Sequence, residues 1–281
     1  TYTMTNANGC SNTASTTITV NPLPAATIAS IGSTTFCQGG NETLLAANAP
    51  SGSTYAYQWS LNGTAIVGAT ANTYVAAATG NYTVTITANN ICAAISPATS
   101  VTVNALPTLL ANTGSTAICQ GATTTLSNAT AGGSWSSNNN NIATINPSTG
   151  LVNGVNAGTA VLTYTYTNAN GCTNSVSTNF TVNALPSATI TAAGATTFCQ
   201  GGNVTLTASA GASYLWSGSN ATTQSIVAST SGNYVVTVTN ANGCSAVSAP
   251  MAITVNTLPA ATITANGPTT FCQGGSVTLV A

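Results

Sequence analysis

Charge is almost absent from this chain of 281 residues, which contains no Lys, Arg, His or Asp and whose one acidic residue is Glu42. Without Lys or Arg, the surface offers no electrostatic footprint for nucleic acid or an anionic membrane, and Lys-based isopeptide cross-links are impossible. Without His or Asp, there is no Ser–His–Asp relay, no general acid–base pair and no carboxylate cage for calcium. These absences predict a protein that is not an enzyme, with no catalytic residue, no cofactor and no nucleic-acid partner.

Closely spaced cysteines are also lacking. The chain has eight cysteines, and no two of them lie closer in sequence than Cys10 and Cys37, which are widely separated. Thiolate metal sites need short spacings such as C-x2-C, so we expect no metal site. There is no signal peptide and no apolar run of the roughly 18 residues that span a bilayer, so we expect no membrane insertion of this segment. The chain starts and stops inside strand-like runs, and we expect a window on a longer polypeptide.

Apolar and uncharged polar residues fill the sequence instead. Hydrophobic residues are 43% of the chain and the mean hydropathy is +0.29, which is enough apolar material for packed cores. Thr, Ser and Asn occupy the polar positions. A net charge near zero normally promotes association. The composition therefore fits an extracellular stalk whose sequence became neutral by drift. It also fits a surface that associates laterally with other copies or carries sugars on Ser and Thr.

Two cysteine motifs recur with nearly the same period. TFCQGG stands at 35–40, 197–202 and 270–275, with AICQGA at 117–122. A second motif, NANGC or its variant ANNIC, is followed each time by a Leu-Pro pair. Such self-similarity indicates three complete repeats of about 75–80 residues between two partial ones. The cysteines of the first motif are Cys37, Cys119, Cys199 and Cys272, and those of the second are Cys10, Cys92, Cys172 and Cys244.

The repeats are predicted to be all-β. In the third complete repeat, short β-branched runs with alternating polarity are separated by Gly, Asn, Ser and Pro, and no ten-residue segment has a helical period with caps. NANG at 240–243 lies between two such runs, and an Asn-Gly pair suits the positive φ of a primed turn, so it predicts a hairpin. Several short strands in one repeat indicate a sandwich. The expected strands are 203–209, 213–217, 223–229, 233–239 and 251–255.

The first and third repeats resemble immunoglobulin-like domains. In the third, GNVTL matches the start of strand B, Trp216 matches the core Trp of strand C, and SGNYVVTVTNANG matches the tyrosine-corner pattern of strand F with Tyr234. Val236 stands where antibody domains have their second core cysteine, so the resemblance implies no B–F disulfide. The first repeat has Trp59, Tyr82 and Val84 at the same places.

The second repeat is similar to a bacterial Ig-like group 2 domain. The matching stretch is WSSNNNNIATINPSTGLVNGVNAGTAVLTYTYTNANG, residues 135–171. It implies that Trp135 is a core residue, and Ala160 stands at the position of the corner Tyr. An exposed Trp can also stack on a sugar, but an alternating strand favours core positions for Trp59, Trp135 and Trp216.

FCQGGxVTL, NANGC and VNxLP in tandem resemble the Ig-like repeats of giant secreted adhesins of Bacteroidota, a family that includes gliding-motility and type IX-secreted surface proteins. The resemblance covers essentially the whole chain and implies an exported, surface-attached repeat protein. We expect a tandem array of immunoglobulin-like β-sandwiches. Its divisions are 1–22, the F–G hairpin ending one domain; 23–104, Ig-like; 105–183, group 2 type; 184–256, Ig-like; and 257–281, the start of a further domain.

Eight cysteines in an exported protein imply disulfides, and two sets of pairs are open. In an Ig-like sandwich the turn into strand B and the F–G hairpin lie at opposite poles, about 20 Å apart, whereas a bridge requires Cα atoms within about 7 Å. Head-to-tail stacking would instead bring each turn beside the hairpin of the next domain. This neighbour-domain model predicts Cys37–Cys172 and Cys119–Cys244, with Cys10 and Cys92 bonded upstream of the window and Cys199 and Cys272 beyond its end. The alternative is the intradomain set Cys37–Cys92, Cys119–Cys172 and Cys199–Cys244.

Other polar residues fit structural roles. Thr rows such as Thr83, Thr85 and Thr87 resemble ice-binding faces, but Thr is common on the outward side of strands. Glu42 is expected to be an exposed residue at the start of a strand. The sequence thus favours a structural segment of a long extracellular filament or adhesin stalk on a bacterial surface, whose partners are adjacent repeats and laterally associated copies. The alternative is a multivalent module with weak glycan or ice sites on each repeat.

Overall fold

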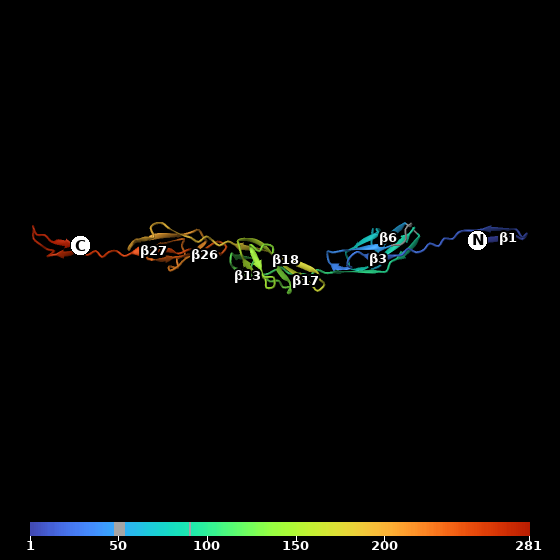
Figure 1. Cartoon of the computed structure of the whole chain (residues 1–281), viewed down its shortest axis with the longest axis horizontal. Helices are drawn as coiled ribbons and strands as arrows, with labels where there is room; N and C mark the ends of the chain where they lie inside the picture. Colours follow the sequence, from blue (N-terminus) through green and yellow to red (C-terminus); the bar gives the residue numbers. More distant parts are fainter. Residues whose placement is uncertain (48–53, 90) are drawn as a thin grey trace. The chain divides into compact units, whose positions relative to one another are not determined.

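β-Strands are the regular elements of the computed structural model, which describes residues 1–47, 54–89 and 91–281 (Figure 1). The expected all-β fold is confirmed, since these residues form no helix, and so none that is long and apolar enough to cross a membrane. By packing, the chain divides into two compact units. Unit 1 is Thr1–Leu109 with Thr165–Ser175, and unit 2 is Leu110–Tyr164 with Val176–Ala281.

Unit 1 contains an N-terminal hairpin and an Ig-like sandwich. The hairpin pairs β1 with β2, one sheet of the sandwich has the order β3-β5-β8, and the other has the order β4-β11-β9-β6-β7 with β10 also on β9. This is the ABE and A′GFCC′ arrangement of an Ig-like domain. The strands are β1 (Tyr2–Thr5), β2 (Ser11–Ala14), β3 (Thr27–Ser30), β4 (Thr35–Cys37), β5 (Glu42–Ala47), β6 (Tyr55–Leu61), β7 (Thr64–Ala65), β8 (Thr73–Ala76), β9 (Gly80–Ala88), β10 (Cys92–Ile95) and β11 (Thr99–Asn104).

The next repeat forms the sheets β12-β18-β17-β14 and β13-β16-β15. The end of β17, the start of β18 and the tip between them are counted in unit 1. The strands are β12 (Ala117–Cys119), β13 (Thr123–Thr125), β14 (Ser134–Ser137), β15 (Ala143–Ile145), β16 (Leu151–Gly154), β17 (Gly158–Thr167) and β18 (Thr173–Asn183).

The third repeat and the C-terminal strands lie in unit 2. Its sheets have the orders β19-β21-β23, β20-β27-β24 and β22-β25-β26, and β28 pairs with β29. The run expected at 233–239 is split between β24 and β25, which pair with different strands. The strands are β19 (Ile190–Ala192), β20 (Thr197–Cys199), β21 (Val204–Ala208), β22 (Ser213–Trp216), β23 (Ser225–Ala228), β24 (Gly232–Tyr234), β25 (Val236–Thr239), β26 (Ser245–Val247), β27 (Met251–Asn256), β28 (Thr264–Asn266) and β29 (Thr278–Val280).

Alternating residues of facing sheets build each core. In the first sandwich, Leu44 on β5 faces Trp59 on β6 and Tyr82, Val84 and Ile86 on β9, and all five side chains are buried. The third repeat repeats this core around Trp216. Trp135 is also buried, with its ring 4.9 Å from that of Tyr164. Alternation in short β-branched strands thus produces the sandwich, because one side of each strand faces the opposite sheet.

Tyr234 differs from the expected core residue, because it is only half-buried. The hydroxyls of Tyr234 and Tyr82 each donate a corner hydrogen bond four residues back, to Thr230 O at 3.1 Å and Ala78 O at 3.0 Å. Tyr74 covers Tyr82 with its ring, at a centroid distance of 5.7 Å. In the third repeat, Ile226 stands at the register position that Tyr74 has in the first repeat. Because an isoleucine covers less area than a tyrosine ring, Tyr234 keeps one side open.

Glu42 is buried, and its expected exposure is wrong. The carboxylate turns back over the preceding loop, where its Oε1 accepts a hydrogen bond of 2.6 Å from the backbone N–H of Gly32. Gly32 lacks a Cβ, which would lie 2.8 Å from Oε2. A charged side chain is buried only where hydrogen bonds compensate its lost hydration, and this backbone donor supplies one.

Candidate functional site

The four CQG motifs form the same tight turn. In each, the N–H two residues after Gln donates to the carbonyl of Cys, as in Gly40 N to Cys37 O at 2.9 Å. The glycine at the third position has positive φ, +93° at Gly39, which identifies a type II turn. Gly40 also lies close under Phe36, where a Cβ would meet Cδ2 at 3.3 Å. CQGG is therefore the sequence of a turn that sets the cysteine at the end of a short strand.

The NANGC tips are hairpin turns organised by their first asparagine. Asn168 Oδ1 accepts the N–H groups of Asn170 and Cys172, both at 3.0 Å, and Asn168 O accepts the N–H of Gly171 at 3.0 Å. Only the glycine of the Asn-Gly pair has positive φ, +77° at Gly171. The predicted primed turn is therefore wrong, because a primed I′ turn needs positive φ at both residues. The geometry is a type I turn followed by a glycine in the left-handed region.

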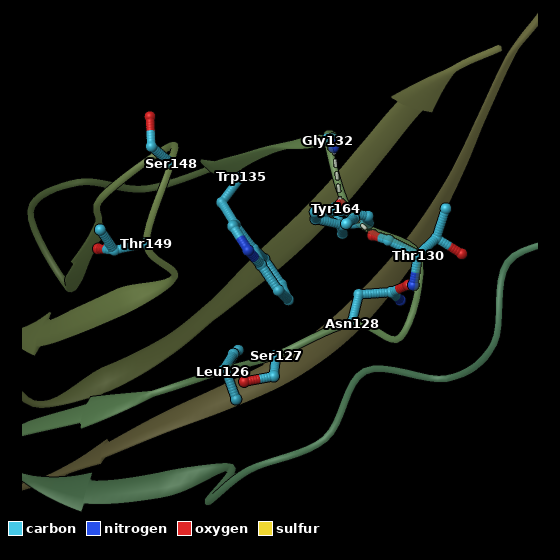
Figure 2. A pocket seen from close by; sticks show the side chains of 11 residues that line it. Leu126, Ser127, Asn128, Thr130, Gly132, Trp135, Ser148, Thr149 and Tyr164 are labelled. Carbon is cyan, nitrogen blue, oxygen red and sulfur yellow. Dashed lines mark hydrogen bonds between the residues drawn. The ribbon is translucent and has the colours of Figure 1, made fainter.

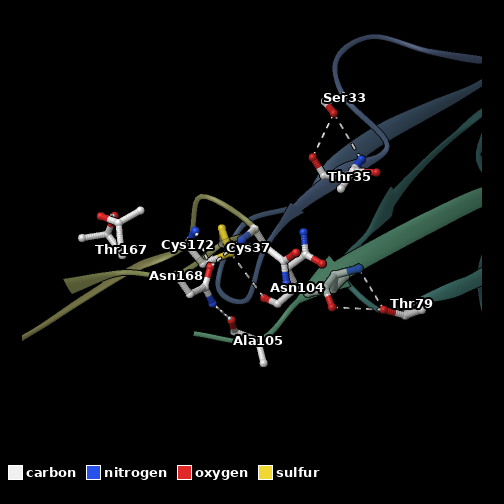
Figure 3. Close-up of a disulfide and its surroundings, with 12 residues drawn as sticks. Ser33, Thr35, Cys37, Thr79, Asn104, Ala105, Thr167, Asn168 and Cys172 are labelled. Atoms are coloured by element: carbon white, nitrogen blue, oxygen red, sulfur yellow. Dashed lines mark hydrogen bonds between the residues drawn. A yellow bond between two sulfur atoms is a disulfide. The ribbon is translucent and has the colours of Figure 1, made fainter. Parts of the chain in front are cut away.

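Disulfides join these two kinds of turn (Figure 3). Cys37 is bonded to Cys172 with a Cα–Cα distance of 5.5 Å, and Cys119 is bonded to Cys244 with a Cα–Cα distance of 5.6 Å. These are the pairs of the neighbour-domain model. Because a cysteine forms one disulfide, neither Cys37–Cys92 nor Cys119–Cys172 nor Cys199–Cys244 is present. Cys172 and Cys244 are fully buried by the contacts around the bond.

Strand register explains why a bridge within the first sandwich does not form. β4 runs parallel to β11 and pairs Cys37 with Asn104, beyond the Gly80 end of β9. Cys92 pairs with Ala88, at the other end of β9. β9 has nine residues, which span roughly 30 Å at about 3.3 Å each. That separation far exceeds the reach of a disulfide, about 7 Å between Cα atoms.

Asparagine side chains hold each tip against the linker that precedes its own repeat. Asn168 Nδ2 donates to Ala105 O at 3.1 Å, beside the disulfide in Figure 3, and Asn240 Nδ2 donates to Ala184 O at 2.8 Å. Asn174 Nδ2 adds a bond to Pro107 O at 2.8 Å. Sequence reasoning treated these asparagines as turn residues and missed their contacts. The signal for them is the joint recurrence of the NANGC tip and an NALP linker in the second and third repeats.

Four cysteines have no disulfide partner among the described residues: Cys10, Cys92, Cys199 and Cys272. The Cys92 thiol donates to Asn21 O at 3.8 Å, and Cys172 Sγ lies at the same distance, 3.8 Å, from Asn104 O. Asn21 matches Asn104 in the VNxLP motif, so Cys92 lies at its linker as Cys172 does. In the described parts of the chain, no group of three or more His, Cys, Asp or Glu side chains could hold a metal ion.

No model of a known protein family matches the chain, and no curated protein matches it. Similar solved structures include a Ca2+-stabilized adhesin that helps an Antarctic bacterium reach out and bind ice, with 14% identity over 90% of this chain and 80% of that one, and a TM-score of 0.40. Another is the Bacteroides ovatus mixed-linkage glucan utilization protein SGBP-B, with 15% identity, coverages of 85% and 72%, and a TM-score of 0.24. The N-terminal eight Ig domains of Down Syndrome Cell Adhesion Molecule have 14% identity, coverages of 94% and 39%, and a TM-score of 0.32.

Proposed function

We propose that this chain is a structural segment of a long extracellular filament or adhesin stalk on a bacterial surface, stiffened by disulfides between neighbouring repeats. The observation that carries the proposal is the bond between the CQG turn of one repeat and the NANGC tip of the next, made twice in succession. The repeats have buried apolar cores and almost no charge, and the described residues hold no metal cluster, so the junctions between repeats are the chemically distinctive feature.

The two disulfide loops interleave, and this supports a load-bearing role. The loop closed by Cys37–Cys172 contains Cys119, and the loop closed by Cys119–Cys244 contains Cys172. A single backbone cut anywhere between Cys37 and Cys244 therefore leaves a covalent path between the two ends. Lys and Arg, the basic residues that the acidic S1 pocket of trypsin selects, are absent from the chain. A stalk built this way resists both force and trypsin-like proteases.

Interleaving also limits how far the segment can be pulled out. Without the bonds, the whole backbone from Cys37 to Cys244 can extend, but the shortest path through both bonds follows only the backbone between Cys119 and Cys172. At about 3.5 Å per extended residue, the limit falls from roughly 720 Å to roughly 190 Å. The proline in each xLP linker fixes φ and restricts the residue before it, which further reduces slack.

Force spectroscopy on the full chain, held by its two ends, tests the proposal. We expect extension between Cys37 and Cys244 to stop near the short limit in oxidised protein and to reach the long limit after reduction. The matched control is Cys199→Ser, which removes an unpaired cysteine and should leave both limits unchanged. Oxidised protein that extends to the long limit would contradict the stalk proposal.

The same proposal covers the surface of the stalk and the export of the protein. Exposed apolar side chains such as Val75, Ile95 and Val227 lie on outer strands that have no charged residue to block pairing. We infer that stalks associate laterally, and that the protein is exported in the manner of Bacteroidota adhesins of the gliding-motility and type IX-secreted kind. Negative-stain images of native material test the association, and well-dispersed single chains would count against it.

A further inference from the structure

A pocket of about 250 Å³ opens in unit 2 beside Trp135 (Figure 2). Ser148 and Thr149 lie on one side of the indole, and Tyr164 and Thr130 lie on the other. Leu126 and the backbone of 131–133 complete the wall. The space exceeds the roughly 30 Å³ share of one water several-fold, so it can admit a small ring.

The wall of this pocket is held in place by hydrogen bonds inside the protein. The Tyr164 hydroxyl accepts the N–H of Gly133 at 2.7 Å and donates to Thr130 O. Asn128 Oδ1 accepts the N–H of Thr130 at 3.0 Å, and its Nδ2 donates to Leu110 O at 2.8 Å. These groups are occupied, so they shape the pocket and are not available to a ligand. A preformed wall lowers the entropy cost of binding.

The indole N–H of Trp135 is a donor without an acceptor. The corresponding N–H of Trp59 donates to Ala71 O and that of Trp216 to Thr223 O, both at 2.9 Å. No described residue accepts a hydrogen bond from Trp135 Nε1, although the residue is only 6% exposed. The nitrogen is not sealed from solvent, because no buried side-chain N or O in the described residues lacks a partner. The nitrogen therefore keeps some accessible area, and Trp135 is one of the residues that line the pocket.

The other polar groups of the pocket are hydroxyls. Ser127, Thr130 and Ser148 line it, and no protein group is hydrogen-bonded to their side-chain oxygens in the described residues. Trp135 and Leu126 are almost fully buried, so each contributes only a narrow apolar edge to the wall. The pocket thus combines the edge of an indole, an N–H donor and several hydroxyls that both donate and accept, with no charge. This is the chemistry that recognises a neutral, polyhydroxylated ring.

We propose that this pocket is a carbohydrate site that binds one neutral pyranose unit, with Trp135 Nε1 donating to a sugar oxygen. The site belongs to the second repeat alone, since the matching indoles of the first and third repeats are satisfied by backbone carbonyls. It is independent of the stalk function proposed above. A stalk of alternating repeats would present such sites at regular intervals along its length.

Hydrogen exchange of the three indole N–H groups tests the premise in the full, oxidised chain. We expect the Trp135 indole proton to exchange at least about tenfold faster than those of Trp59 and Trp216, because only the latter two are hydrogen-bonded and roughly 1.4 kcal/mol of protection corresponds to tenfold. Equal protection of all three would overturn the proposal, because it would mean that Trp135 has an internal acceptor.

Titration with methyl glycosides of glucose, galactose and mannose tests binding, with the indole N–H signals followed by NMR. We expect a saturable shift of the Trp135 signal with one of the three sugars, and none at Trp59 or Trp216. Ser148→Phe, which fills the mouth from an exposed position, should abolish the shift. Ser219→Phe, an equally exposed serine of the third repeat, is the matched control and should retain it.

Trp135→Phe keeps an aromatic ring but removes the donor, and we expect at least a tenfold loss of affinity measured on the sugar's own signals. Trp216→Phe, which removes a donor already used by the protein, should bind normally and controls for loss of core packing. No saturation with any glycoside up to about 100 mM, a concentration that would populate even a millimolar site, would overturn the proposal and leave a water-filled pocket. So would equal shifts at all three indoles.

Discussion

Glu42 is a buried carboxylate in a chain with no basic residue, and one backbone N–H compensates it. The corresponding residue of the third repeat is Val204, which is buried as well, so the sandwich does not require an acid there. The acid instead fastens the loop at Gly32. A polar residue can therefore replace an apolar one in this core where a local donor is available.

Replacing Glu42 tests this account. Glu42→Ala leaves the Gly32 N–H without its acceptor, and we expect a loss of about 1–3 kcal/mol. Glu42→Gln keeps an acceptor and should cost less than half as much. Hydrogen exchange of the β5 and β9 amides measures the stability of this sandwich separately from the others. Equal losses for Ala and Gln would mean that the charge, and not the hydrogen bond, is what matters.

The phenol of Tyr82 makes the stability of the first sandwich depend on pH in the alkaline range. Burial raises the pKa of its phenol above the ordinary value of 10.0. Below about pH 10 the phenol is protonated in both folded and unfolded chains. Above that, the unfolded chain releases the proton first, so stability is lost as the pH rises. We expect Tyr82→Phe to weaken this alkaline loss, measured by unfolding across the alkaline range.

At the scale of elements, a single asparagine of the hairpin tip has two roles. Asn168 organises its own turn and also binds the linker at Ala105, whereas Asn6 makes the same turn without a linker contact among the described residues. Comparing the two tips therefore separates the contribution of the turn from the contribution of the junction. The strands of this array are short, so the residues of the turns between them determine the position of each cysteine.

Asn168→Ala removes both sets of bonds, and Asn6→Ala removes the turn bonds alone. With about 1 kcal/mol for each hydrogen bond, we expect the first to cost about 1 kcal/mol more than the second. Amide exchange at Cys172 and at Cys10 measures the two losses. If the losses are equal, the contact with Ala105 does not contribute to the junction.

At the scale of the whole molecule, the two disulfides close loops with sequence separations of 135 and 125 residues. In the chain-entropy model each contributes about 5 kcal/mol by restricting the unfolded state. We expect the double variant Cys37→Ser and Cys172→Ser to lower the thermal midpoint of the first sandwich, while Cys199→Ser leaves it unchanged. Peptide mapping of non-reduced protein checks the pairing, and a cross-linked Cys37–Cys92 peptide would contradict the neighbour-domain arrangement.

The sequence by itself determined the all-β class, the repeat period and most core positions, because alternation and β-branched residues are local signals. It identified Trp59, Trp135 and Trp216 as buried, and it located the hairpin at each NANGC. It was wrong about the turn type, because Asn-Gly suits several turns and only the partners of Asn168 select one.

Only the tertiary structure decided what depends on distant partners. The burial of Glu42 rests on a loop ten residues upstream, and the half-burial of Tyr234 rests on a smaller residue in the facing sheet. Both pairing sets were compatible with the cysteine spacing. The choice came from the parallel pairing of β4 with β11, which places Cys37 at one end of the sandwich and Cys92 at the other. A disulfide forms where three-dimensional distance permits, and the sequence alone does not contain that distance.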